Sequence, residues 1–171
     1  MNLGRSELRQ VLAPVAGSLG RMRDVLRQQL TESSGAVRDM TDHVSRFDGK
    51  QLRAALVLLT GEATGNTTDE HPTVAAIVEM IHLATLVHDD AVDHSVLRRG
   101  QPTVNSLWTH QIAIIMGDYL YSRAVTELAT VGPKLVAAER TLLADGGNGT
   151  PCVAARFDAP AETLLIAVNL E

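Results

Sequence analysis

The chain has 171 residues, of which 45% are hydrophobic and 3% aromatic, and its formal net charge at pH 7 is -5. This length suits one domain or part of a larger one, and the acidic balance with few aromatic side chains argues against a nucleic-acid-binding protein. The single cysteine, Cys152, excludes an internal disulfide and a cysteine-built zinc site.

No apolar run reaches the roughly 18 residues that a membrane span requires. The longest candidate, residues 74–87, is interrupted by Glu79 and His82. The first residues mix charged side chains and lack the apolar segment of a signal peptide. We therefore expect a cytoplasmic protein without a transmembrane segment.

Helical periodicity dominates the first 135 residues, whereas strand signals are nearly absent. The amphipathic repeat over residues 8–30 predicts a helix that Pro14 kinks or breaks. Residues 31–35 have the polar composition of a turn. Residues 51–59 are apolar on most faces, which predicts a buried helix.

Further along the chain, the composition of residues 61–72 predicts a loop. Thr73 is expected to cap a long helix that runs to about His94, because its hydroxyl can accept hydrogen bonds from first-turn amides. Residues 105–132 predict one or two more helices that end at the Gly132–Pro133 pair. The first part of the chain is thus expected to be all-α.

The segment His82 to Arg99 carries most of the candidate chemistry. Asp89 and Asp93 are one helical turn apart on one face, and His82 lies two turns earlier on that face. Acidic residues at this spacing usually only solvate a helix, but here they end an apolar helix. Two carboxylates on one face suit Mg²⁺, which completes its octahedron with substrate phosphates.

Basic side chains accompany these aspartates in two places. Arg98 and Arg99 follow shortly after Asp93, and guanidinium groups are well suited to phosphate oxygens. Lys50 and Arg53 lie three residues apart at a predicted helix start, where both can reach one anion near the first amides. Two sites of this kind suggest two phosphorylated substrates.

Three segments together carry a resemblance to a known family. They are Gly49-Lys50-x-x-Arg53, the run from His82 to Asp93 with residues 97–103 (LRRGQPT), and residues 117–124 (GDYLYSRA). In this register they resemble the trans-isoprenyl diphosphate synthases of the polyprenyl synthetase family. The resemblance covers residues 5–138, so we expect an incomplete helical domain over 1–138 and a divergent tail over 139–171.

The resemblance implies the N-terminal part of an isoprenoid-synthase-type bundle of helices around a central cavity. It also implies isoprenoid biosynthesis by Mg²⁺-dependent condensation of an allylic diphosphate with isopentenyl diphosphate. Three aspartates would form the catalytic group, with Asp89 and Asp93 as Mg²⁺ ligands and Asp90 in support. Arg98 would contact the allylic diphosphate. Four side chains would hold isopentenyl diphosphate: Lys50, Arg53, His82 and Arg99.

The sequence also departs from the family. Family members are longer and carry a second aspartate-rich motif, whereas the aspartates after Asp93 are isolated: Asp118, Asp145 and Asp158. A truncated or frame-shifted product, a replaced tail and one partner of a two-chain assembly would each produce this pattern. We expect impaired catalysis by this chain alone, and an exposed apolar face that favours a homodimer or a partner subunit.

Two other interpretations stay open. A non-catalytic or partial subunit could bind diphosphate and need a partner chain for turnover. An HD-type metal phosphohydrolase would use the His88–Asp89 pair, but His43 and His71 lie in loop-like surroundings. For a synthase, the absence of aromatic residues at Ala84 and Thr85, one turn below Asp89, favours a medium- or long-chain product.

Overall fold

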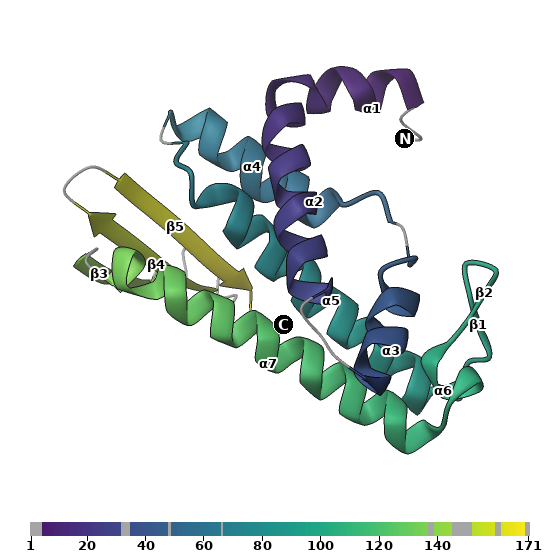
Figure 1. The fold of residues 1–171 in the computed structure, drawn as a ribbon. Helices are drawn as coiled ribbons and strands as arrows, with labels where there is room; N and C mark the ends of the chain where they lie inside the picture. Colours follow the sequence, from purple (N-terminus) through teal and green to yellow (C-terminus); the bar gives the residue numbers. More distant parts are fainter. Residues whose placement is uncertain are drawn as a thin grey trace. The chain divides into compact units, whose positions relative to one another are not determined.

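The computed structural model describes residues 5–31, 35–47, 49–65, 67–136, 139–144, 152–159 and 162–169. The chain divides into two compact units, Met1–Leu128 and Ala129–Glu171. Figure 1 shows helices in the first of these and a small sheet in the second. Among the described helices, none combines the length and the apolar character needed to cross a bilayer.

The first helical segment is interrupted where a proline was expected to interrupt it. Helix α1 spans Arg5–Leu12, a 3-10 turn covers Ala13–Val15, and helix α2 spans Ala16–Thr31. Pro14 lies within that turn, because proline has no amide hydrogen for the α-helical ladder. The predicted break at Pro14 is confirmed.

Helices α3, α4 and α5 follow, over Ala36–Val44, Leu52–Thr64 and His71–Val92. The predicted loop over 61–72 is therefore too long at both ends. At its start, α4 continues to Thr64 and closes on Gly65, which has the left-handed φ of 72° typical of a helix C-terminus. At its end, α5 begins at His71 rather than at Thr73.

Two local features account for these boundaries. Pro72 occupies the first turn of α5, where a missing amide hydrogen costs nothing and the fixed φ favours helix. Gly61 is buried inside α4 against the ring of His71, and a β-carbon there would lie 2.6 Å from that ring. The glycine therefore permits close helix packing and does not end the helix.

A short hairpin and two helices complete the first unit. Strands β1, Leu97–Arg98, and β2, Gln101–Pro102, pair antiparallel and are followed by α6, Val104–Leu107. Helix α7, His110–Val136, begins in the first unit and continues past its last residue, Leu128. Helix α7 continues through the Gly132–Pro133 pair, so the predicted stop there is wrong. One missing amide hydrogen near the end of a 27-residue helix leaves most of its hydrogen-bond ladder in place.

Helix α5 is the central element of the first unit, with α2 and α4 packed against it (Figure 1). Its first half packs with α2 and α4, and its second half packs with α7. The fully buried side chains of these layers include Met22, Leu58, Met80, Met116 and Leu120. The prediction of a helical domain is confirmed for residues 5–136, where the described strands are limited to the two-residue β1 and β2.

Helix α4 is less buried than its composition predicts. Ala54, Ala55 and Leu58 face the core, whereas Leu52 and Leu56 are exposed. An apolar face of α4 is thus left uncovered within the described residues.

The second unit contains three strands that the periodicity of the sequence does not predict. They are β3 (Glu139–Ala144), β4 (Cys152–Ala159) and β5 (Glu162–Asn169), paired antiparallel in that order. In the register, Leu142 is opposite Ala155, which is opposite Ile166. Residues 145–151 (DGGNGTP) have the composition of a turn, but the strands themselves show no sustained alternation, because pairing partners rather than local propensity define them.

Candidate functional site

The two aspartates predicted to bind metal lie at the end of α5. Asp89 is in the last turn and Asp93 is the C-terminal cap, and both side chains are exposed. The backbone amide of Asp93 donates a hydrogen bond to the carbonyl of Asp89 at 2.8 Å. The one-turn spacing inferred from the sequence therefore holds up to the end of the helix.

Asp90 has different surroundings from its two neighbours. Its side chain is only 4% exposed, and its two carboxylate oxygens accept from Nε and Nη2 of Arg98 at 2.6 and 2.9 Å. The hydrogen bond with Asp90 raises the pKa of Arg98, and the negative charges of Asp89 and Asp93 act in the same direction. Arg98 thus lies within the field of all three aspartates while it binds one of them.

The hairpin between β1 and β2 separates the two adjacent arginines. Its two central residues, Arg99 and Gly100, have positive φ angles of 52° and 81°, as in a type I′ turn. This turn directs Arg98 back to Asp90. The guanidinium of Arg99 lies instead beside Gly49, 3.0 Å from the position that a β-carbon would take there.

Three of the four predicted basic residues, Arg53, Arg98 and Arg99, lie close enough to His82 to act on it. Arg53 donates from Nη1 to Nε2 of His82 at 3.0 Å, and Lys50 adjoins Gly49, where Arg99 lies. Burial is the largest cause that lowers the pKa of His82, and the charge of Arg53 is the next. Arg99 and Arg98 lower this pKa as well, so both cations act on the same imidazole.

The start of α4 differs from the expectation of an open anion site at its amides. The helix begins at Leu52, after Lys50, and the amide of Ala54 in its first turn donates to Oε1 of Glu79 at 3.1 Å. Glu79 belongs to α5 and is 8% exposed. In the sequence, Glu79 interrupts an apolar run. An acidic residue in such a run is rarely buried without a partner, and this was the signal that could have found it.

His88 connects the aspartate-bearing end of α5 to α7. Its Nε2 donates to the carbonyl of Ile114 at 3.1 Å and lies 3.4 Å from the carboxylate of Asp118. The ring occupies the place that a β-carbon of Gly117 would fill. In the third sequence segment, Gly117 therefore leaves room for the ring of His88 and Asp118 contacts it. Sequence reasoning did not assign this role.

Two histidines considered for a phosphohydrolase have structural partners. His43 is on α3 rather than in a loop, and its Nε2 donates to the carbonyl of Pro102 at 2.8 Å. His71 begins α5, and its Nδ1 accepts from the amide of Thr68 at 3.0 Å. The loop-like surroundings predicted for both are wrong, and neither joins His88 in a metal site.

The two positions one turn below Asp89 differ in burial. Ala84 is 2% exposed and packs in the core with Val87 and Met116, whereas Thr85 is exposed. The hydroxyl of Thr85 donates to the carbonyl of His82 at 2.8 Å. Only Thr85 therefore lies on the same open face as the predicted site.

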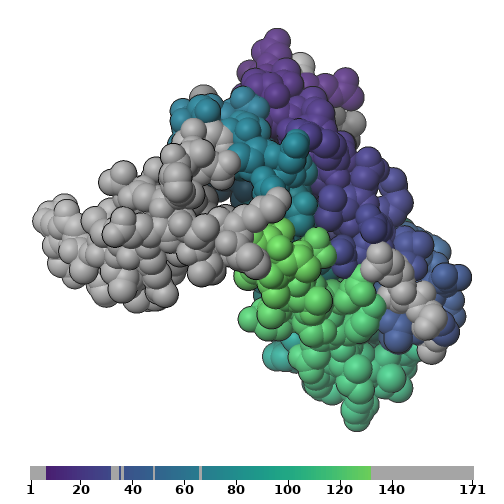
Figure 2. Space-filling model, turned by 60° about the vertical axis from the view of Figure 1, so that its left-hand side comes forward, coloured from purple at the N-terminus to yellow at the C-terminus, as the bar shows by residue number. Residues whose placement is uncertain are grey.

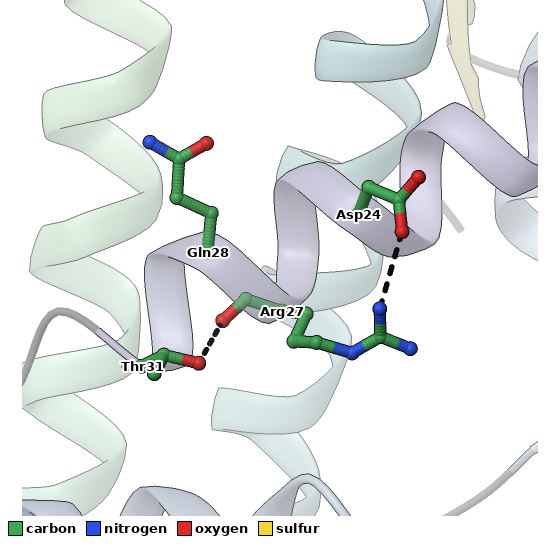
Figure 3. A pocket seen from close by; sticks show the side chains of 4 residues that line it. All are labelled: Asp24, Arg27, Gln28 and Thr31. Carbon is green, nitrogen blue, oxygen red and sulfur yellow. Dashed lines mark hydrogen bonds and ion pairs between the residues drawn. The ribbon is translucent and has the colours of Figure 1, made fainter.

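Two surface cavities lie near α2. A hollow of about 450 Å³ is lined by four residues of this helix, Asp24, Arg27, Gln28 and Thr31 (Figure 3). Asp24 pairs with Arg27 at 3.2 Å, and the Thr31 hydroxyl donates to the Arg27 carbonyl. None of the predicted site residues lines it. A larger cavity of about 670 Å³ extends from Arg23 and Arg27 to Lys50.

Side-chain hydrogen bonds hold α2 against α7. Arg123 of α7 donates to the side chain of Gln29 of α2 at 2.7 Å, and Gln29 in turn donates to Glu127. Figure 2 shows the coloured surfaces of these helices as one continuous body.

Within the described ranges, no three His, Cys, Asp or Glu side chains gather closely enough to hold a metal ion by themselves.

The comparisons with known proteins agree with the motifs. The family model described as Polyprenyl synthetase matches residues 35–145, which confirms the resemblance found in the sequence. An all-trans-nonaprenyl-diphosphate synthase (geranyl-diphosphate specific) from Rhodobacter capsulatus is 39% identical over 141 residues, covering 82% of this chain and 42% of that protein. A heptaprenyl diphosphate synthase component 2 from Geobacillus stearothermophilus is 30% identical over 126 residues, covering 74% and 39%.

A solved structure supports the fold assignment. A polyprenyl synthase from Caulobacter crescentus CB15, complexed with calcium and isoprenyl diphosphate, aligns with a TM-score of 0.69 and 25% identity, covering 76% of this chain and 41% of that one. The chain thus spans about two fifths of the length of each of these three proteins.

Proposed function

The chain belongs to the polyprenyl synthetase family, and from this premise we propose that it acts in isoprenoid biosynthesis as a trans-prenyl transferase or part of one. The reaction condenses an allylic diphosphate with isopentenyl diphosphate to a medium- or long-chain polyprenyl diphosphate. One observation carries the proposal: an exposed pair of carboxylates ends α5, and a group of basic side chains surrounds His82 on the same helix.

The carboxylate pair fits a divalent cation. Asp89 and Asp93 offer exposed oxygen donors one turn apart, and Mg²⁺ is usually bound by one or two carboxylates plus substrate phosphates. These two residues would hold Mg²⁺, whose positive charge would stabilise the departing diphosphate when it is bound. The calcium and isoprenyl diphosphate of the Caulobacter structure support this assignment.

The remaining site residues divide between the two substrates. Arg98, held by Asp90 within the field of Asp89 and Asp93, would bind the allylic diphosphate, so Asp90 supports the reaction by orienting Arg98. Guanidinium groups placed in advance stabilise the negative charge that develops on the leaving group. Four side chains would hold isopentenyl diphosphate: Lys50, Arg53, His82 and Arg99.

A second function is a subunit that binds diphosphate and needs another chain for turnover. Helix α7 favours it, because apolar side chains along its length are exposed within the first unit: Ile114, Ile115, Tyr121, Val125 and Leu128. Such a surface is typical of an interface with a second copy or a partner. The Geobacillus relative is itself named as one component of a synthase.

The test is a binding and turnover experiment on the full chain. Pyrophosphate binding is titrated with and without Mg²⁺, and labelled isopentenyl diphosphate is then incubated with an allylic diphosphate. The double variant Asp89→Asn/Asp93→Asn should lose the Mg²⁺-dependent part of binding. Asp69→Asn is the matched control, because Asp69 is an exposed acid that pairs with Arg21 and takes no part in the site.

The outcomes separate the two functions. Prenyl products that vanish in the double variant but persist in the control support a synthase. Mg²⁺-dependent binding without products supports the diphosphate-binding subunit. Binding that the double variant leaves unchanged would contradict both.

A further inference from the structure

The first turn of α4 is held by a residue of another helix. Its N-cap, Gln51, has left-handed backbone angles of φ 49° and ψ 39°, and its side chain makes no capping hydrogen bond. A non-glycine residue in this conformation is strained, and such strain persists where surrounding contacts impose it. Glu79 of α5 supplies the missing acceptor by binding the amide of Ala54 at 3.1 Å.

The position of Glu79 links this cap to the basic group of the site. Ala54 directly follows Arg53, and Glu79 lies one turn before His82 on α5. The cap therefore joins the two helices just below the 3.0 Å contact between Arg53 and His82. The carboxylate also acts on the imidazole directly, since its charge raises the pKa of His82 against the effects of burial and Arg53.

We propose that Glu79 is a positioning residue of the isopentenyl diphosphate subsite, and that it acts through the hydrogen bond it accepts from Ala54. By fixing the start of α4 against α5, this bond sets the distance between Arg53 and His82 before the ligand arrives. Because the Ala54 amide is already occupied, the diphosphate is bound by side chains rather than by that amide. The inference rests on the function proposed above.

Two conservative variants separate the hydrogen bond from the charge. Glu79→Gln keeps an oxygen acceptor at the same reach and removes the negative charge. Glu79→Asp keeps the charge and withdraws the acceptor by one methylene. If positioning through the bond is what matters, Glu79→Asp should weaken binding by about tenfold, by analogy with the loss of a residue that orients a metal ligand. Glu79→Gln should bind about as tightly as the unaltered chain, because the acceptor is kept and two charge effects oppose each other: a negative charge near the anion is gone, and the pKa of His82 falls.

The control addresses general destabilisation of the same helix pair. Gly61→Ala disturbs the packing of α4 on α5 at the opposite end of α4, where the new β-carbon meets the ring of His71. This variant should lower stability and leave the affinity unchanged. Affinity is measured by calorimetric titration of isopentenyl diphosphate into the full chain with EDTA present, so that only the metal-independent subsite contributes.

The results that overturn the inference are distinct from those that overturn the function. Failure of the unaltered chain to bind isopentenyl diphosphate contradicts the proposed function. If that chain binds, then equal affinity in Glu79→Asp, or a loss in Glu79→Gln as large as in Glu79→Asp, contradicts the positioning role. A loss of affinity in Gly61→Ala that matches Glu79→Asp would assign the effect to stability alone.

Discussion

The ion pair between Asp90 and Arg98 allows a sharp test of how the aspartate motif divides its work. Replacement of Asp90 by Asn removes the negative charge from a side chain that is 4% exposed and leaves Arg98 partly buried without its partner. Breaking a buried pair in this way costs about 3–5 kcal/mol. Because the Arg98 side chain is 23% exposed and water can solvate it in part, we expect the lower end, about 3 kcal/mol.

The adjacent aspartate provides the matched control. Asp89→Asn makes the same chemical change one residue away, on an exposed side chain, and should alter the free energy of unfolding by about 0.5 kcal/mol or less. Unfolding in urea, followed by circular dichroism at helix wavelengths, measures both variants. In a chain of this size, about 3 kcal/mol corresponds to a fall in Tm of roughly 6–12 °C.

A double-mutant cycle then attributes the loss to the pair. Asp90→Asn, Arg98→Met and the combined variant should show a coupling energy of about 2 kcal/mol, within the range for directly bonded residues. Strict additivity would refute the reasoning, as would a loss in Asp89→Asn equal to that in Asp90→Asn. Additivity would mean that the contact between Asp90 and Arg98 does not stabilise the fold, and equal losses would mean that the effect is not specific to the buried aspartate.

Three further predictions concern the neighbouring residues. Gly117→Ala should displace the ring of His88 from its seat and cost about 1–3 kcal/mol of unfolding free energy in the same urea assay. For His82, the pKa in the folded protein lies below its ordinary 6.5, so the unfolded chain binds a proton more readily. The free energy of unfolding should therefore rise with pH up to about 6.5. Urea unfolding at a series of pH values measures this rise, and His82→Gln should remove the part that is due to His82. Ala84→Phe should overpack the core and lower the free energy of unfolding by about 1–3 kcal/mol. Thr85→Phe should leave this free energy nearly unchanged and shorten the products in a chain-length assay.

These predictions have their own controls. Gly20→Ala is the match for Gly117→Ala, since a β-carbon at Gly20 meets no atom within 4 Å and helix propensity favours alanine by about 1 kcal/mol. A pH dependence that persists unchanged in His82→Gln would show that other groups cause it. Equal stability of Ala84→Phe and Thr85→Phe would contradict the placement of Ala84 in the core.

Local rules were enough to predict most of the helices, though not α3 or several helix ends, and the one-turn spacing of the aspartate pair. The break at Pro14 follows from a missing amide hydrogen, and the alignment of Asp89 with Asp93 follows from 3.6 residues per turn. Both depend only on residues within one or two turns of each other. The identity and spacing of the motif residues could therefore be interpreted without the fold.

What the sequence did not predict depends on contacts between distant segments. The capping of Ala54 by Glu79 joins residues 25 positions apart, and the seat of His88 on Gly117 joins α5 to α7. No periodicity encodes such pairs, because they result from the packing of one helix on another. The same reason applies to the strands after residue 138, whose hydrogen bonds come from neighbouring strands.

The acidic residues of α5 show why one helix can both build the site and anchor it. Glu79 and Asp90 are about three turns apart, so they lie on one face of α5, and both are buried and bonded to neighbouring elements. His82 and Asp93 have the same separation and lie together on an adjacent, more open face with Asp89. The buried carboxylates fix α4 and the arginine hairpin, while the exposed groups are the ones that we propose to bind a metal and diphosphates. A change on the buried face should therefore alter affinity through geometry, and a change on the open face should alter it through lost contacts.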